Sequence, residues 1–414
     1  MNEAKQKFRL TGLERAWILY DVGNSAFVLL VATLIPIFFN ALAEEGGLSS
    51  VEYLAYWGYA ASAVTVITAV LSPILGTLAD TRNYKKPIFT FCVAVGVIGC
   101  CAMGMASTWL PFLLIFIFAK VGFSGSLVFY DSMLSDVTVP DRMDEVSSKG
   151  YAWGYIGSCV PFVVCLALVL GAGSIGISQM TALNLALFIT AAWWLVTTLP
   201  LLRQYKQVHF VEVQEHAIRQ SFARIGHTLR HLKEDRQVFW FLLAFFCYID
   251  GVYTIIDMAT AYGTALGLDT TGLLLALLVT QIVAFPSALV FGRLSGQYPS
   301  GTLIPVCIAA YAGIALFAFF LKHQWQFWVL AVVVGMFQGG IQALSRSHFA
   351  KIIPPEKSGE YFGLFDICGK GASFLGTMIV SVGSQLTGSA NVGVGSLIVL
   401  FIVGFVLFRV SDQK

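Results

Sequence analysis

Long apolar runs separated by short polar breaks extend along almost the whole chain. Each run holds about 20 or more residues, which is the length that an α-helix needs to cross the hydrocarbon core of a bilayer. We place twelve such runs at 17–42, 53–79, 87–107, 109–137, 150–171, 180–202, 238–265, 271–296, 301–321, 325–350, 361–386 and 391–409. The pattern therefore predicts an all-α membrane protein with twelve transmembrane helices.

One polar connection, at 203–237, is much longer than the others and divides the runs into six and six. Apolar residues recur in it at steps of four and three, which predicts an amphipathic helix along the membrane surface; they are Ile218, Phe222, Ile225, Leu229 and Leu232. We expect a six-helix bundle in 1–202, a linker in 203–237 and a second bundle in 238–414. Short similar segments occur at corresponding places of the two halves, such as "LYDVGNSAF" in run 1 and "CYIDGVYTI" in run 7. This internal similarity predicts that the two bundles are pseudo-symmetric.

Composition and charge agree with this pattern. Hydrophobic residues make up 57% of the chain and charged residues only 12%, whereas soluble domains hold about 25% charged residues. A formal net charge of +2 gives no reason to expect a nucleic-acid partner. Most Lys and Arg residues fall in alternate connections, so the positive-inside rule places both termini in the cytoplasm. The first run is too long for a cleavable signal, and the compact chain suggests a bacterial cytoplasmic (inner) membrane.

Metal and enzyme chemistry have little support in the sequence. The eight cysteines all lie in apolar runs without metal-ligand spacing, and His227 and His231, one helical turn apart, have no third ligand nearby. The chain contains no metalloprotease helix motif, no phosphate-binding glycine loop with lysine and no nucleophile elbow. We therefore expect no metal, no cofactor and no enzymatic activity.

Ionisable and amide side chains within the apolar runs are the candidate site, because a charge at mid-bilayer costs about 2.5 to 3.5 kcal/mol on insertion scales. They form stripes at helical spacing in runs 1, 4, 7, 10 and 11. The predicted substrate and coupling residues are Asp21, Asn24, Lys120, Asp131, Asp250, Tyr253, Asp257, Gln338, Gln342, Asp366 and Lys370. Runs 1, 4, 7 and 10 hold corresponding positions in the two halves, so we expect their polar faces to line one water-filled cleft. The alternative is that these groups only join helices, as an Asp366–Lys370 ion pair one turn apart would do.

The sequence also resembles known proteins at two levels. "GTLADTRNYKK" (76–86) resembles the signature that follows the second span in the major facilitator superfamily, although Thr81, Asn83 and Tyr84 depart from it. Longer tracts are similar to bacterial relatives of the autophagy-related vacuole effluxer family, whose fungal members are linked to amino-acid export from the vacuole. They are "WILYDVGNSAF", "CYIDGVYT", "FYDSMLSDVTVPDRMDEVSSKGYAWGYIGS" and "QGGIQALSRSHFAKIIPPEKSGEYFGLFDICGK".

The resemblance implies a major facilitator fold, in which two six-helix bundles surround a central cavity and open alternately to either side. In that superfamily, the positions filled here by Asp80, Arg82 and the neighbouring lysines form ion pairs that close the cytoplasmic side. By the same resemblance, Asp136 and Arg346 are expected to act at the corresponding loops of the two halves.

These observations predict a secondary active transporter, most simply a monomer in the lipid bilayer, that exports a small polar or zwitterionic, amino-acid-like solute. Fixed acids and Lys120 in one cleft would complement an ammonium and a carboxylate group of the same ligand. Protonation of a desolvated carboxylate is the expected coupling step. An exporter of amphipathic drugs or lipid-like molecules, a sodium-coupled or sugar-type facilitator, and a transporter-like receptor remain alternatives.

Overall fold

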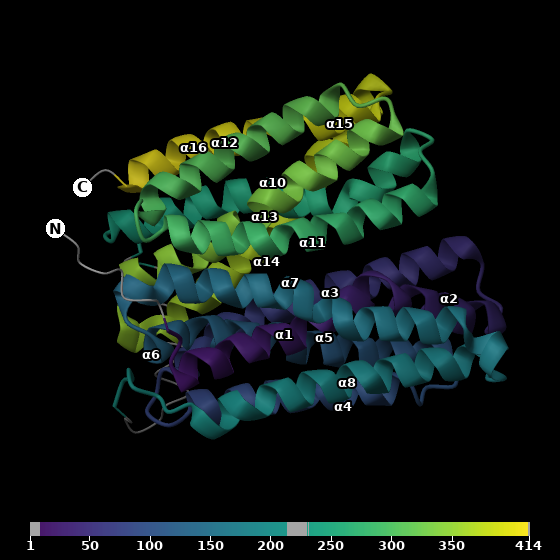
Figure 1. The fold of residues 1–414 in the computed structure, drawn as a ribbon, viewed down its shortest axis with the longest axis horizontal. Coiled ribbons are helices and arrows are strands. Elements are labelled where there is room, and N and C mark those ends of the chain that lie inside the picture. Colours follow the sequence, from purple (N-terminus) through teal and green to yellow (C-terminus); the bar gives the residue numbers. More distant parts are fainter. Residues whose placement is uncertain (1–8, 213–229, 231, 413–414) are drawn as a thin grey trace.

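The computed structural model describes residues 9–212, 230 and 232–412. The predicted amphipathic linker helix lies outside the described residues, except for Leu232, and so do His227 and His231. Two bundles of helices pack side by side, and the start of α1 and the end of α16 lie on one side of the molecule, which we call the termini side (Figure 1). The opposite side is called the distal side.

The first bundle contains the helices before the long connection. They are α1 (Gly12–Ala32), α2 (Leu34–Glu45), α3 (Ser50–Ala79), α4 (Lys85–Met103), α5 (Trp109–Ser132), α6 (Leu134–Val137), α7 (Pro140–Leu170), the 3₁₀ turn η1 (Ala172–Ile175) and α8 (Gln179–Gln204). The second bundle contains α10 (Arg236–Ala265), α11 (Thr270–Leu294), α12 (Ser300–Phe319), α13 (Gln324–Ile352), the 3₁₀ turn η2 (Pro355–Lys357), α14 (Ser358–Thr387), α15 (Ala390–Gly395) and α16 (Ile398–Asp412).

The lengths and apolar character of these helices fit a bilayer. Among the described residues, 11 helical stretches are long and apolar enough to cross a membrane, with α1 and α2 together forming one of them. The 30-residue helix α14 adds a twelfth long helix to the two bundles. The prediction of an all-α, multi-pass membrane protein with paired six-helix bundles is thus confirmed.

The helix ends differ from the predicted spans mainly at α7. The sequence pattern placed this span at 150–171, whereas α7 begins at Pro140, which occupies its first turn. Proline is favoured there because the first helical N–H groups have no intrahelical acceptor. The added turns carry Asp141, Arg142 and other polar residues, so an apolar-run criterion misses them although they continue the helix. The predicted span 109–137 likewise ends at Ser132 and continues as the separate helix α6.

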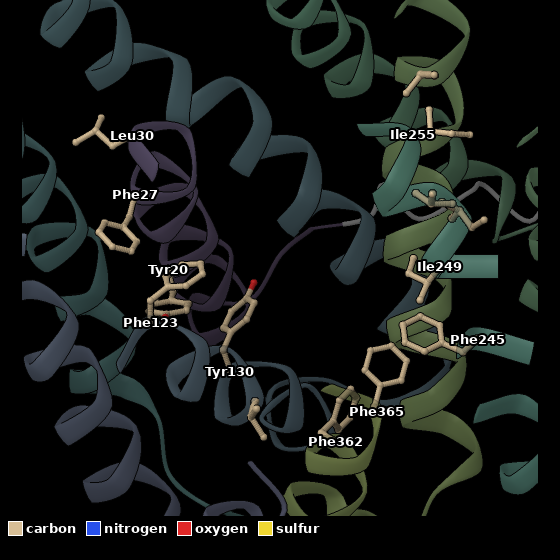
Figure 2. Close-up of a cluster of buried hydrophobic side chains, with 14 of the residues drawn as sticks. Tyr20, Phe27, Leu30, Phe123, Tyr130, Phe245, Ile249, Ile255, Phe362 and Phe365 are labelled. Atoms are coloured by element: carbon tan, nitrogen blue, oxygen red, sulfur yellow. The ribbon is translucent and has the colours of Figure 1, made fainter. Parts of the chain in front are cut away.

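Buried aromatic side chains form two groups, one in each bundle. Tyr20, Phe27, Phe123 and Tyr130 come from α1 and α5, whereas Phe245 and Phe365 come from α10 and α14 (Figure 2). On the termini side, the backbones of α3 and α14 touch, because a Cβ atom at Gly76 would lie only 2.2 Å from the carbonyl oxygen of Gly359. The bundles are therefore in direct contact at the termini side.

Candidate functional site between the bundles

A buried arginine of the second bundle reaches into the first. Arg346 on α13 is only 2% exposed. Its Nη1 lies 3.0 Å from Oδ1 of Asp131 on α5 and 3.7 Å from Oδ2 of Asp21 on α1. Its Nε donates to Oγ of Ser147 at 3.0 Å, and its Nη2 donates to the Ser147 carbonyl at 3.1 Å. Two predicted acids and one predicted arginine therefore meet in one cluster.

Aromatic rings enclose the same guanidinium group. The Cζ atom of Arg346 lies 4.6 Å from the ring centre of Trp17, 5.3 Å from Tyr130 and 4.3 Å from Tyr151. Such distances allow cation–π attraction, which is strengthened when water is excluded. We call this set of first-bundle groups the arginine box; it consists of Trp17, Asp21, Tyr130, Asp131, Ser147 and Tyr151.

A glycine on α7 leaves room for the guanidinium. A Cβ atom at Gly150 would lie 3.0 Å from Trp17, 3.1 Å from Nη2 of Arg346 and 3.1 Å from Oδ2 of Asp21. These contacts are tighter than ordinary van der Waals contact, so a larger residue would have to displace the arginine or the ring. Asn24, one turn along α1 from Asp21, donates through Nδ2 to the carbonyl of Tyr20 at 3.0 Å and lies 3.5 Å from Oδ1 of Asp21.

A second pair of opposite charges lies farther toward the distal side. Lys120 on α5 and Asp257 on α10 belong to different bundles and attract each other electrostatically. The ammonium of Lys120 lies 4.8 Å from the ring centre of Phe123, and Asp257 is exposed in the last third of α10. Tyr253, one turn before Asp257 on α10, experiences the charges of Asp257, Asp131 and Arg346, so it lies between the two charged clusters.

Asp250 does not lie with Asp257, although the sequence pattern put both on one stripe. Asp250 is fully buried between α10 and α14, where its Oδ1 accepts from the backbone N–H of Gly376 at 2.9 Å and from Thr254 at 3.3 Å. Its Oδ2 accepts no hydrogen bond from the residues that the structure describes. Helical spacing fixes the direction of a side chain but not which neighbouring helix covers it, and here α14 covers Asp250.

The two predicted glutamines of α13 lie beside α7. Gln342 accepts a hydrogen bond from Tyr155 at 3.4 Å through Oε1. Gln338 is buried, and in the described part of the chain no donor lies within hydrogen-bond distance of its Oε1. It borders a cavity of about 60 Å³ inside the second bundle, which Thr254, Tyr262 and Gln281 also line. By this measure the space is large enough for a few water molecules, which could satisfy the glutamine oxygen.

Asp366 on α14 joins the bundles by a different contact. Its Oδ2 accepts a hydrogen bond from Ser72 on α3 at 2.7 Å. The predicted partner within the same helix, Lys370, has a side chain outside the described part of the structure. The Asp366–Lys370 pair therefore stays a prediction.

The termini-side contact between α3 and α14 is built on Asp80. Its two carboxylate oxygens accept from the backbone N–H groups of Gly359 at 2.7 Å and Glu360 at 2.9 Å, in the first turn of α14. The positive end of the helix dipole favours a carboxylate at this place. Lys85, also fully buried, lies 3.8 Å from Asp80 and donates to Ser358 at 2.8 Å.

Arg82 and Asp136 differ from what the resemblance implied. Arg82 is exposed and pairs with Glu212 of its own half at 3.3 Å, so it takes no part in the described contact between the bundles. Lys85 occupies the buried position instead, because it begins α4 directly beneath the α3–α14 contact. Asp136 lies 3.8 Å from Lys85 and bonds to the segment after α8 rather than to the second bundle.

That segment, 205–212, covers the Asp80 loop like a short strand. Val211 exchanges backbone hydrogen bonds with Asp80 and Arg82, and Asp136 accepts from the backbone N–H of His209 at 2.8 Å and lies 3.0 Å from its Nδ1. Burial would raise the pKa of Asp136, but the hydrogen bond from His209 and the charge of Lys85 outweigh it and lower that pKa. The same hydrogen bond raises the pKa of His209.

Several residues of this region were not predicted. Lys351 on α13 forms an ion pair with Asp144 on α7 at 2.6 Å, which is a further contact between the bundles. Trp17, Tyr151 and Ser147 of the arginine box were missed because aromatic and small polar residues are common in membrane helices and carry no special signal. Among the described residues, no group of three metal-ligating side chains is placed to hold an ion.

Comparisons with known proteins agree with this architecture. The profile of the family described as "Vacuole effluxer Atg22 like" matches residues 13–141 and 135–414. An uncharacterised MFS-type transporter, YxiO of Bacillus subtilis, is 42% identical over 411 residues, covering 98% of this chain and 96% of that protein. Autophagy-related protein 22 of Coccidioides immitis is 24% identical over 430 residues, covering 83% and 70%.

Among solved structures, the major facilitator transporter FucP in its outward conformation superposes with a TM-score of 0.73 at 17% identity. The alignment covers 97% of this chain and 98% of that one. At this identity the match concerns the fold, which is the one expected from the resemblance in the sequence. YxiO and FucP are both described as major facilitator transporters, which are not enzymes.

Proposed function

Because the chain belongs to the Atg22-like family of major facilitator transporters, we propose that it is a proton-coupled secondary transporter exporting a small zwitterionic, amino-acid-like solute. The observation that carries this proposal is the pair Lys120 and Asp257, which are opposite charges of different bundles that attract each other electrostatically. A zwitterion offers a carboxylate to the lysine and an ammonium to the aspartate, so both fixed charges keep a partner when the ligand binds.

The contacts between the bundles support alternating access. Asp80, Arg346 and Lys351 all make their bundle-to-bundle contacts on the termini-side half of their helices. We infer that the structure is closed toward the termini side and that transport requires these contacts to break while the distal side closes. The chain then works as two bundles, 1–202 and 238–414, joined by the linker 203–237.

The charge distribution supports an orientation in which the termini side is cytoplasmic. Most Lys and Arg residues of the connections lie on that side, as the positive-inside rule requires for a bacterial cytoplasmic membrane. In this orientation export means loading from the termini side and release on the distal side. A monomer suffices for this cycle, because both halves of the transport path come from one chain.

Flux measurements in liposomes test the proposal. The purified protein is reconstituted and offered labelled neutral and basic amino acids, sugars and lipophilic cations, with and without a pH gradient. We expect gradient-driven flux of amino acids, and a loss of at least about tenfold in the variants Lys120→Met and Asp257→Asn, since each removes one charged contact. The control is Lys322→Gln, which alters an exposed lysine on the distal side. Flux of sugars alone, or amino-acid flux unchanged in both variants, would refute the proposal.

An apolar groove favours export of amphipathic molecules as the second candidate. It has a volume of about 280 Å³, lies between α3 and α4 with α5 as its floor, and is lined almost wholly by apolar residues such as Leu71, Phe91 and Phe118. Phe91 and Phe118 are both well exposed on the outer surface, so the groove opens toward the lipid. If only lipophilic cations are transported, and Gly125→Leu in the groove floor stops their flux, this candidate replaces the amino-acid proposal.

A further inference from the structure

The arginine box has the composition of a binding site for an organic cation, and in this structure the side chain of Arg346 occupies it. Three aromatic rings, two carboxylates and the Ser147 carbonyl surround the guanidinium of Arg346. Aromatic faces and carboxylates are the groups by which proteins recognise ammonium and guanidinium ligands. Every member of the box belongs to the first bundle, whereas Arg346 belongs to the second.

This division between the bundles has a consequence for the transport cycle. If the bundles separate on the termini side, α13 moves away from α1, α5 and α7, and Arg346 leaves the box. The box itself stays intact, because its members are held within one bundle: the indole N–H of Trp17 donates to the Tyr130 carbonyl at 2.9 Å, and the two rings stack at 4.3 Å. An empty box then opens toward the termini side.

The charges of the box require replacement cations. Asp21 and Asp131 are two acids around one guanidinium, and Oδ2 of the buried Asp21 lies 3.7 Å from Arg346, beyond hydrogen-bond distance, and accepts no hydrogen bond from the described residues. Asp366 of α14 also acts on Asp131 and adds negative potential to the site. Once Arg346 has left, two neighbouring carboxylates repel each other, and any part of them that stays out of water is costly without a cation. One monovalent cation and one proton restore the balance.

We propose that the arginine box binds the ammonium or guanidinium group of the transported solute when the termini side is open, and that Arg346 displaces this group on closing. The ligand class is a primary amine or guanidine of small size, amino acids included. This inference rests on the proposed function, because it assumes that the bundles separate on the termini side.

The arginine box and the Lys120–Asp257 pair are then two successive binding sites on one transport path. Lys120 and Asp131 lie eleven positions apart on α5, which corresponds to about 16 Å along a helix. A small amino acid cannot reach both at once. The cation group binds in the box on entry from the termini side, and return of Arg346 pushes it toward Asp257. In this order Arg346 is both the closing element and the competitor of the substrate.

Removal of the internal competitor tests the box directly. The variant Arg346→Ala, as the full chain purified in detergent, leaves a space of guanidinium shape. We expect methylguanidinium and methylammonium to raise its melting temperature in a saturable way. Methylurea, a neutral molecule of the same shape as methylguanidinium, should bind at least about tenfold more weakly, because it lacks the charge. In the double variant Arg346→Ala and Asp131→Asn, the shift should be lost.

The proposal is overturned if methylguanidinium stabilises Arg346→Ala no better than methylurea does, or if the shift persists in the double variant. Should Arg346→Ala fail to fold, the wild-type protein supplies the same comparison: cations added on the termini side must inhibit solute flux competitively, and methylurea must not. Equal inhibition by methylurea also overturns it. Saturable cation binding without any amino-acid flux would support the binding role of the arginine box and refute the proposed function. Amino-acid flux without cation binding would support the proposed function and refute the binding role of the box.

Discussion

Replacement of Asp80 by asparagine should release the termini-side contact with little change in shape. The carboxylate holds two backbone N–H groups of α14 at 2.7 and 2.9 Å and is fully buried. In Asp80→Asn one oxygen is kept, but the second position becomes an NH₂ group that cannot accept from an N–H donor. The substitution thus removes one of the two hydrogen bonds, and it removes the negative charge that strengthens the remaining one.

The size of the effect follows from these two bonds. A hydrogen bond to a charged group contributes about 1.5 to 3 kcal/mol, and a neutral one about 1 kcal/mol. Two charged bonds are exchanged for one neutral bond, so the closed state should lose about 3 kcal/mol relative to a state in which Asp80 is hydrated. Since 1.4 kcal/mol corresponds to a factor of about ten, the open population should rise about a hundredfold.

The rise in the open population can be measured with a thiol at a different contact between the bundles, the one between α7 and α11. Ser148 on α7 is fully buried, and a Cβ atom at Gly292 on α11 would lie 2.9 Å from it. In a Ser148→Cys background, the maleimide reaction at position 148, quantified by peptide mass spectrometry, measures how often the bundles separate there. Asp80→Asn should speed that reaction about a hundredfold, in proportion to the open population.

Arg82→Gln is the matched control, because Arg82 belongs to the same loop but its side chain contacts Glu212 and Phe210 of the segment 205–212 rather than the second bundle. An exposed ion pair of this kind contributes about 0 to 1 kcal/mol, so its loss should leave the reaction rate nearly unchanged. The reasoning is refuted if Asp80→Asn leaves the thiol as slow to react as in the parent, or if Arg82→Gln accelerates it equally.

Three further substitutions test other parts of the structure. The contact between protonated His209 and Asp136 contributes stability that is complete below pH about 6.5 and is lost as pH rises through the raised pKa of His209. Hydrogen exchange of the backbone amides in 205–212 should therefore accelerate with pH by more than the intrinsic exchange rate does. His209→Gln should remove this additional acceleration. Gly150→Val should displace Arg346 and lower the melting temperature by an amount equivalent to about 1 to 3 kcal/mol, whereas Gly58→Ala, where a Cβ meets open space, should not. Asp250→Asn should keep solute binding but lose the response of flux to a pH gradient, because its buried carboxyl has no cationic partner among the described contacts; unaltered gradient-driven flux would remove Asp250 from coupling.

The fold was predictable because a bilayer imposes one simple requirement on the sequence. Every spanning segment must satisfy its backbone hydrogen bonds internally, so helix length and apolar runs determine the architecture. The exceptions lie where helices extend beyond the lipid, as α7 does from Pro140, since polar turns outside the bilayer look like loops in a hydropathy pattern. The break in the first span at Thr33 also had no clear signal, because Thr and its neighbours fit an apolar helix.

The sequence predicted the site only as a set of ionisable residues that are costly to bury in a membrane. Desolvation cost identifies Asp21, Asp131 and Asp250 from sequence alone, but it does not say which helix will cover each of them. Arg346 brings the first two together, whereas α14 encloses the third. The aromatic rings around Arg346 could not be distinguished from the many lipid-facing aromatics. Partner identity depends on the crossing of helices far apart in sequence, and no local spacing encodes that.

The polar character of the contacts between the bundles suits an interface that must open and close repeatedly. In the proposed cycle, Asp80, Arg346 and Lys351 would exchange protein partners for water when the termini side opens. Buried ion pairs gain little net energy over hydrated ions, because desolvation offsets their attraction. The two states can then differ by only a few kcal/mol, a gap that a bound solute or one proton is able to reverse. A fully apolar interface of the same area would lose its whole hydrophobic stabilisation on opening. Because these charges are costly to bury, the free energy needed to open the closed structure stays small enough for ligand binding to supply it.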